Sequence, residues 1–291
     1  MFLEATEPDI LPLRVGPTVQ FYRYGLFGSN TQATPEGVVG VGIKLSSSTV
    51  SATVQEYSDY LTTSSFLEEV AIDPIVTNAS EQLGYRAAIS VDTIARIEAD
   101  VATALVPVGS FISTRDVRRA KALMEAKNVL PKLGTDYLGI AHPYHIYDLM
   151  SDNSPSGWLD VMRYSNPAVY KDGWINNLNG EAGKAEGVRF LKSNNVGTTT
   201  VAATGTTKYN MYVFGKGGLG SVALQGRGPA SVRNPMAQSF KVNVIKGGPS
   251  IADPEGKIGS AVSYRFVWTV KRLTTGDDDR YRVIQSPVSL A

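Results

Sequence analysis

Cysteine is missing from this 291-residue chain, and histidine occurs only twice. Without thiols the protein can form no disulfide, no thiolate zinc site, no iron–sulfur cluster and no cysteine nucleophile. Its stability must therefore come from packing or from assembly with other chains.

An excess of charge is missing too, because 28 basic residues stand against 27 acidic ones. No uniform field exists to hold nucleic acid or an anionic membrane non-specifically. No apolar run approaches the roughly 18 to 20 residues of a membrane span. The first residues include Glu4, Glu7 and Asp9, where a secretory signal needs a basic start and an apolar run. We therefore expect a protein that is made in the cytoplasm and contacts no membrane.

Turn-forming residues are plentiful, with 28 glycines and 15 prolines. Together with 43% hydrophobic residues, they indicate a folded protein with substantial β structure. The length favours two packed cores or one elaborate domain.

The first 20 residues place apolar side chains among Pro8, Pro12 and Pro17. This pattern can neither continue a helix nor sit inside a sheet, so it predicts an extended arm. Because apolar side chains should not lie free in water, we expect the arm to lie on its own body or on a neighbouring chain.

A strictly alternating segment follows the arm. Its apolar residues are Val39, Val41, Ile43 and Leu45 before a serine run, then Val50, Ala52 and Val54 after it. The alternation predicts a β-hairpin that is apolar on one face. A two-stranded hairpin is marginal in water, so it needs a surface to lie on.

Helical spacing begins after Tyr60. Ser65 is expected to cap a short helix that Pro74 interrupts, and Ser90 to cap a longer helix that Pro107 ends. Together these segments predict a long, broken helical spine.

Ser113 and Asp116 form the pattern of a capping box, which predicts a further helix. Residues 137–141 are typical of a buried strand, and Pro143 suits the first position of a short helix. Six later segments predict strands: Val188–Leu191, Tyr209–Phe214, Ser221–Leu224, Phe240–Ile245, Tyr264–Val270 and Tyr281–Ile284. The expected class is therefore mixed α+β.

Two motifs suggest chemistry only weakly. Residues 215–220 match the glycine spacing of a dinucleotide-binding loop, but strand and turn residues follow where that site needs a helix, so a glycine-rich turn is favoured. The run Asp277–Asp279 lacks the spacing of a calcium loop and is typical of a hairpin tip.

The two histidines, His142 and His145, lie close to Asp148 in the sequence and could supply metal ligands or a general base. A structural role is favoured, because a helix N-terminus repels a cation and no second acidic cluster is evident. A basic stretch is either a solvated helix face or a surface next to packaged DNA; its members are Arg115, Arg118, Arg119 and Lys121.

Four stretches between residues 56 and 224 carry a resemblance to a known family. They are Glu56–Tyr60 with Ala71–Pro74, Ala141–Pro143 with Asp148–Leu149, Gly180–Gly183 with Val188–Phe190, and Tyr209–Gly215 with Ser221–Leu224. In order and character they resemble the N4-like major capsid proteins of tailed bacteriophages, which share the Hong Kong 97-like shell fold.

The resemblance implies a particular division of the chain. The expected parts are an N-terminal arm (1–36), an extended hairpin loop (37–60), a peripheral domain with the spine helix (61–135), an axial domain (136–230) and a β-rich return to the peripheral domain (231–291). Residues expected at contacts between subunits are Ile10, Leu11, Leu13, Val39, Val41, Ile43, Leu45, Val50, Val54 and Tyr57.

The implied function is structural, without enzymatic activity or cofactor. The chain would form pentamers and hexamers of an icosahedral phage head around double-stranded DNA, assembled in the bacterial cytoplasm. Portal, scaffolding and decoration proteins would be further partners. Three alternatives stay open: an encapsulin-like nanocompartment shell, a metal-dependent hydrolase centred on His142 and His145, and a carbohydrate-binding β module.

Overall fold

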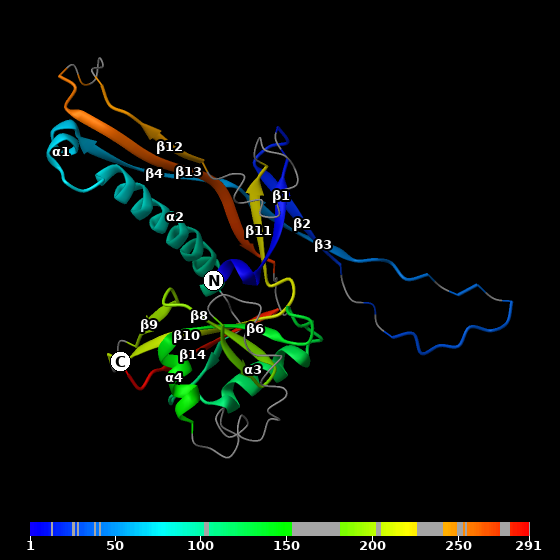
Figure 1. The fold of residues 1–291 in the computed structure, drawn as a ribbon. Helices are drawn as coiled ribbons and strands as arrows, with labels where there is room; N and C mark the ends of the chain where they lie inside the picture. The colour runs from blue at the N-terminus through cyan, green and yellow to red at the C-terminus, as the bar shows by residue number, and fades with distance from the viewer. Residues whose placement is uncertain are drawn as a thin grey trace, which may run out of the picture.

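A computed structural model describes most of the chain. The described residues are 1–12, 14–24, 27, 29–37, 39–40, 42–101, 105–152, 181–201, 205–225, 241–248, 253, 255–273 and 280–290. Figure 1 shows an elongated part made of strands and one long helix, a rounded body of strands and short helices, and a thin loop that projects away from both. The class is mixed α+β, as the sequence predicts.

The elongated part is built on one long strand, β13 (Ile258–Arg272). On one side it pairs antiparallel with β4 (Gln55–Ser64). On the other side it pairs first with β12 (Lys241–Ile245) and then with β11 (Leu219–Leu224). We call these strands, together with β1 (Thr6–Leu11) beside β11, the peripheral sheet.

The spine is a single helix, α2 (Ile75–Asp100), which packs along β13. It buries one residue in every four, namely Ala79, Leu83, Ala87, Val91, Ala95 and Ala99. The mostly small side chains of this stripe let the helix lie close to the sheet.

Two of the predicted helix signals differ from the structure. The short helix α1 (Ser65–Val70) is capped by Ser64 rather than Ser65, and Pro74 separates it from α2 as predicted. Ser90 starts no helix, because it lies inside the continuous helix α2, where its hydroxyl donates to the carbonyl of Arg86. Such back-bonding satisfies a mid-helix serine that would otherwise compete with the helix. Pro107 lies in a short strand, β5 (Leu105–Pro107), after α2 has ended.

The rounded body holds a sheet, which we call the axial sheet, with seven strands among the described residues. Its central strand β10 (Thr207–Phe214) pairs with β14 (Tyr281–Pro287) and with β6 (Tyr137–Ala141). The remaining strands are β5 beside β14, and β8 (Val188–Lys192), β7 (Glu181–Ala185) and β9 (Thr198–Thr200). The predicted buried strand at 137–141 is confirmed, since all five residues are buried.

Two helices accompany this sheet. The capping box that begins α3 (Thr114–Glu125) is confirmed, with Ser113 and Asp116 in the predicted roles. Proline occupies the first turn of α4 (Pro143–Ser151), also as predicted. Residues 215–218 join β10 to β11, which confirms the glycine-rich turn, and Leu219 and Gly220 already belong to β11. Asp277–Asp279 lie outside the described residues.

The N-terminal segment is part of the body over its first eleven residues. A short 3-10 helix, η1 (Phe2–Ala5), buries Phe2 and Ala5 completely. Strand β1 follows and pairs parallel with β11. Among the described residues β1 pairs with β11 alone, and Pro8 is tolerated at such an edge because its missing N–H need not cost a ladder bond.

The predicted hairpin is wrong in its pairing. Strand β3 (Ser47–Thr53) pairs with β2 (Thr18–Tyr24), not with residues 39–45. Val19, Phe21, Tyr22 and Tyr24 give β2 a strong strand tendency, whereas Gly40 and Gly42 weaken that of the predicted partner. The long loop joining β2 to β3 is therefore residues 25–46.

Candidate assembly surfaces

The base of the projecting loop is anchored to the body. Val19 and Phe21 of β2 pack on a small cluster of Leu11, Ala52 and Val222. Phe21 also lies against Gly220, where a Cβ atom would come within 2.8 Å of its ring. The loop is thus aimed by packing at its root, while its tip stands clear of the body (Figure 1).

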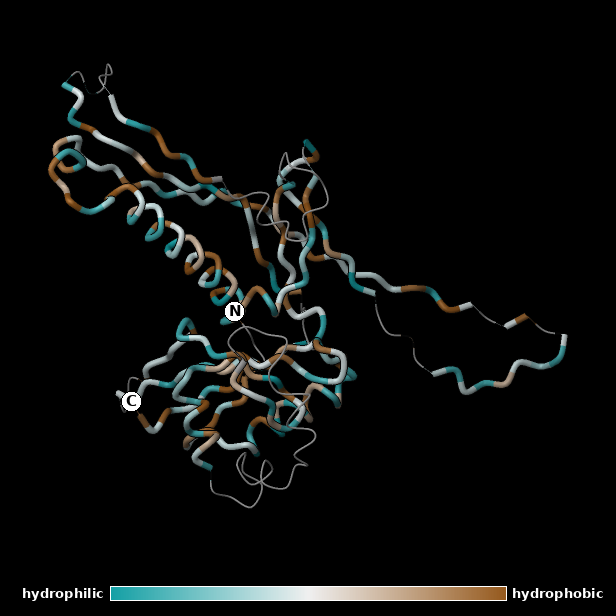
Figure 2. The backbone as a smooth tube through the Cα atoms, viewed as in Figure 1, coloured by the Kyte–Doolittle hydropathy of each residue, from teal (hydrophilic) through white to brown (hydrophobic). Residues whose placement is uncertain are grey.

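The limb of the loop that returns to β3 carries apolar side chains that are exposed to solvent. Val39 is 93% exposed, Ile43 66% and Leu45 57%. Figure 2 shows apolar stretches along this segment among polar ones. Burial of such a side chain contributes roughly 1.5–3 kcal/mol, so contact with a partner at this limb of the loop would be favourable.

The other residues expected at subunit contacts are placed differently. Ile10 is exposed on β1, whereas Leu11 is buried in its own chain. Val50, Val54 and Tyr57 are half-buried, and Tyr57 stacks on Phe266 with ring centroids 5.2 Å apart. Leu13 and Val41 lie outside the described residues.

Further exposed apolar side chains, which the sequence reasoning missed, lie on two elements of the elongated part, α1 and β12. On and just after α1 the exposed apolar residues are Phe66, Leu67, Val70 and Ile72, and on β12 they are Val242, Val244 and Ile245. The short alternating run of β12 gave a signal for a strand but none for which face would stay uncovered.

The basic stretch is partly neutralised within the chain. The guanidinium of Arg118 donates to both carboxylate oxygens of Glu186, at 2.7 and 3.2 Å, and Glu186 raises the pKa of Arg118. Lys121 lies 3.5 Å from the carboxylate of Glu125. Arg115 and Arg119 are exposed on α3.

The two histidines serve the fold. The Nδ1 atom of His142 accepts from the backbone N–H of Tyr144 at 3.2 Å and caps α4. His145 is fully buried with Nε2 3.0 Å from the hydroxyl of Ser286, and burial lowers its pKa to about 4. Asp148 accepts from the backbone N–H and hydroxyl of Ser289.

These contacts leave the three side chains with separate partners rather than one shared centre. Among the described residues, no group of three histidine or acidic side chains is placed to hold a metal ion. The geometry therefore gives no support to a hydrolase centred on these residues.

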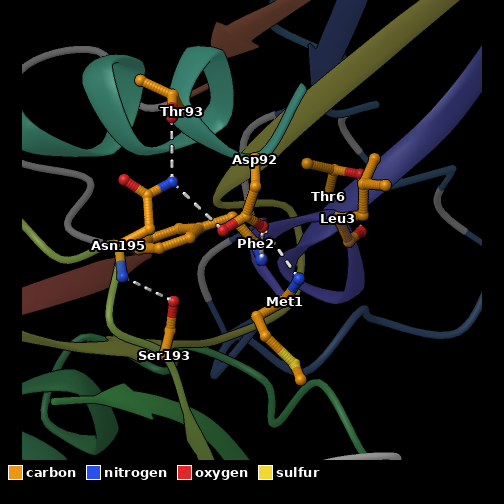
Figure 3. Close-up of polar contacts among 8 residues, drawn as sticks. All are labelled: Met1, Phe2, Leu3, Thr6, Asp92, Thr93, Ser193 and Asn195. Atoms are coloured by element: carbon orange, nitrogen blue, oxygen red, sulfur yellow. Dashed lines mark hydrogen bonds and ion pairs between the residues drawn. The ribbon is translucent and has the colours of Figure 1, made fainter. Parts of the chain in front are cut away.

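A polar junction joins the N-terminal segment, the spine and the axial sheet (Figure 3). One oxygen of Asp92 accepts from the amine of Met1 at 2.8 Å and the backbone N–H of Phe2 at 2.7 Å. The amide of Asn195, just after β8, donates to the other oxygen of Asp92 at 3.3 Å and to the hydroxyl of Thr93 at 3.0 Å.

The C-terminal end of the spine is fixed to the same sheet. Tyr212 donates to the carboxylate of Asp100, and Asn210 donates to the same oxygen at 2.9 Å. Burial and the Asp100 charge raise the pKa of Tyr212. Tyr281 donates to the carbonyl of Ala99 at 3.2 Å. The helix is thus held at both its middle and its end.

This arrangement is found in known shells. The capsid of Ralstonia phage GP4 is 12% identical with a TM-score of 0.74, covering 98% of this chain and 87% of that one. The capsid of the cyanophage P-SCSP1u is 16% identical with a TM-score of 0.67, covering 99% and 88%. The chain has the Hong Kong 97-like capsid fold. The resemblance stated from the sequence is therefore confirmed for the fold.

The same capsid fold is shared by a protein of another kind. The SrpI encapsulin of Synechococcus elongatus is 10% identical with a TM-score of 0.57, covering 96% of this chain and 85% of that one. No protein-family model matches the sequence, and no curated protein matches it. Within the described residues, no helix is long and apolar enough to cross a membrane.

Proposed function

We propose that this chain is a structural shell subunit, the major capsid protein of a tailed bacteriophage. The observation that carries the proposal is the capsid fold over 98% of the chain, at a TM-score of 0.74. The exposed apolar side chains on the returning limb of the loop support it, because an isolated soluble protein gains nothing from keeping Val39, Ile43 and Leu45 in water.

In this proposal the copies form pentamers and hexamers of an icosahedral head. Contacts between different patches on neighbouring copies close into rings around symmetry axes, and the rings tile a shell. The near-balance of 28 basic and 27 acidic residues suits this packing, since strongly charged copies would repel one another. Portal, scaffolding and decoration proteins would be its further partners. No enzymatic step is needed.

The proposed content of the shell is double-stranded DNA, and the proposed location is the virion after assembly in the host cytoplasm. In the basic stretch, Arg118 and Lys121 form ion pairs with carboxylates of their own chain. The side chains of Arg115 and Arg119 are exposed. Two such charges per copy, repeated over a shell, would favour DNA by counterion release without any sequence preference.

An encapsulin-like shell is the second candidate, because an encapsulin shares the fold. The two differ in content. Particles isolated from their native source would contain DNA in the first case and protein cargo in the second, and absorbance together with mass spectrometry of purified particles separates them.

The returning limb of the loop allows a direct test of shell assembly. Replacing Ile43 and Leu45 together by Asp should leave a folded subunit that builds no shells, because two charges would be buried at each contact. Thr31→Asp, at an exposed polar position of the same loop, is the control and should assemble normally. Electron microscopy counts the particles, and circular dichroism checks the fold. Normal shells from the double variant would remove the loop from the assembly contacts.

A further inference from the structure

The two strands at the root of the projecting loop, β2 and β3, have two different faces. Val19 and Phe21 of β2 pack on the small apolar cluster that anchors the loop. Successive side chains of a strand alternate between the faces, and cross-strand partners share a face. The opposite face, which we call the outer face, therefore consists of exposed side chains from both strands: Thr18, Gln20, Tyr22 and Tyr24 of β2, and Ser47, Thr49, Ser51 and Thr53 of β3.

The outer face has an unusual composition for an exposed surface. Each of its side chains carries a hydroxyl or an amide, and none carries a charge. On the surface of a soluble protein about 25–35% of the residues are usually charged. The Oγ1 atoms of Thr18 and Thr53 lie 3.3 Å apart, and the hydroxyl of Tyr22 donates to Gln20 at 3.3 Å. The face is thus neutral and rich in hydroxyls, which both donate and accept hydrogen bonds.

Two aromatic rings belong to this neutral surface. Tyr22 is 62% exposed and Tyr24 is 59% exposed. They are two residues apart on one strand, so they lie on the same side of it and roughly 7 Å from each other. The strand that carries them is fixed from behind, because a Cβ atom at Gly220 would come within 2.8 Å of the ring of Phe21. The two rings therefore form a pre-positioned platform.

A platform of this kind fits a neutral polysaccharide. The C–H groups of a sugar ring are slightly positive and can pack against the negative face of an aromatic ring. The hydroxyls of the sugar exchange hydrogen bonds with hydroxyl and amide side chains, which orient the ligand. Tyrosine and serine divide these roles at antibody binding surfaces, where tyrosine gives rigid contact area and serine gives adaptable hydrogen bonds.

Other kinds of ligand fit the outer face less well. Nucleic acids and acidic glycans are bound by basic side chains that neutralise their charge, and this face has neither lysine nor arginine. The centre of a protein–protein interface is mostly apolar, whereas the outer face offers only the rings of Tyr22 and Tyr24 as large apolar area. The absence of charge and the many hydroxyls together favour a neutral, polyhydroxylated partner.

We propose that the outer face of β2 and β3 binds neutral polysaccharide. Sugar rings stack on Tyr22 and Tyr24, and the hydroxyls of Thr49 and Ser47, which lie opposite these tyrosines, bond to the hydroxyls of the sugar. This activity goes beyond the proposed function and does not depend on it. In a shell, many copies of the face would bind one polymer together, so that a weak single contact becomes firm attachment of the particle.

Retention on coated beads tests the proposal. The purified chain is incubated with magnetic beads coated with dextran, mannan or laminarin, and uncoated beads give the background. We expect at least one polymer to retain the protein. Tyr22→Ala combined with Tyr24→Ala should raise the amount of polymer needed to retain half of the protein at least about tenfold, because two stacking contacts are lost.

Two further variants separate stacking from a general loss of surface tyrosine. Tyr60→Ala combined with Tyr85→Ala removes tyrosines that are 71% and 65% exposed on β4 and α2, and should change retention less than about twofold. Tyr22→Phe combined with Tyr24→Phe keeps the rings, so it should stay within about threefold of the unsubstituted protein. Circular dichroism checks each fold. If the alanine pair does not fold, Thr49→Glu replaces it, because a charge buried under the sugar should also abolish retention.

The outcomes separate this proposal from that of the shell. Retention by none of the three polymers would refute the binding site and leave the shell proposal untouched, and so would retention that the alanine pair does not weaken. A phenylalanine pair as weak as the alanine pair would refute stacking on the rings. If no polymer retains the protein and the alanine pair builds no particles, the outer face is a contact between copies instead.

Discussion

At the scale of single residues, Asp92 holds three parts of the molecule together. Its carboxylate accepts from the N-terminal segment and from Asn195 while it sits in the middle of the spine. The sequence reasoning did not single out Asp92, which lies inside α2. Its role depends on contacts with residues far away in the chain, which no local pattern encodes.

Asp92→Ala should lower the free energy of unfolding of the unassembled subunit by about 2 kcal/mol, because hydrogen bonds to a charged acceptor are lost. The midpoint of urea unfolding measures this. Asp73→Ala, at an exposed position before the spine, is the control and should change stability by less than about 0.5 kcal/mol. Equal effects of the two substitutions would refute the role of Asp92.

His145 should make the subunit sensitive to acid. Its pKa is about 4 when folded, against about 6.5 when unfolded, so between these values the unfolded chain binds the extra proton and stability falls as the pH falls. From pH 7 to pH 5 this costs about 2 kcal/mol. Urea unfolding at both pH values measures this loss of stability, which should be smaller by about 2 kcal/mol in His145→Gln than in the unsubstituted protein. An identical loss in both proteins would contradict this assignment.

At the scale of elements, the sequence predicted what local chemistry determines. The capping box of α3, the proline of α4 and the later strands were read correctly because side chains close in sequence make the decisive contacts. The β2–β3 pairing was missed because it joins segments that the long loop separates. The apolar surface of β12 was missed for a related reason, since the coverage of a strand depends on its neighbours in the sheet.

Removal of the serine cap of α3 measures how much one such local contact contributes to the stability of the subunit. Ser113→Ala should destabilise the subunit by about 1 kcal/mol, the usual effect of removing a serine cap. Ser110→Ala, in the exposed turn just before it, should have almost no effect. Thermal unfolding of the two variants makes the comparison. If Ser113→Ala left the unfolding temperature unchanged, the capping box would contribute nothing to stability.

At the scale of the whole molecule, the N-terminal segment joins the elongated part to the rounded body. Phe2 is fully buried and meets Tyr212 of the axial sheet edge to face, with ring centroids 5.1 Å apart. Its core cluster also contains Leu83 and Val91 of the spine and Phe266 of β13. This segment is thus a joint within the subunit over its first eleven residues, and its removal would disturb folding before it disturbed assembly.

Phe2→Ala should therefore cost about 3–5 kcal/mol in the unassembled subunit, the usual range for a fully buried phenylalanine. Leu3→Ala, next in the chain but 38% exposed, should cost far less. Urea unfolding monitored by tyrosine and tryptophan fluorescence checks the difference. A small effect of Phe2→Ala would mean that the two parts are stable without this joint.

The central claim is that copies of this chain build a closed shell, and electron microscopy of the purified, unsubstituted protein tests it most directly. The capsid fold and the anchored loop with its exposed apolar side chains together predict closed particles, tens of nanometres across on the scale of hundreds of copies. A chain that stays monomeric at every concentration and salt condition would contradict the account.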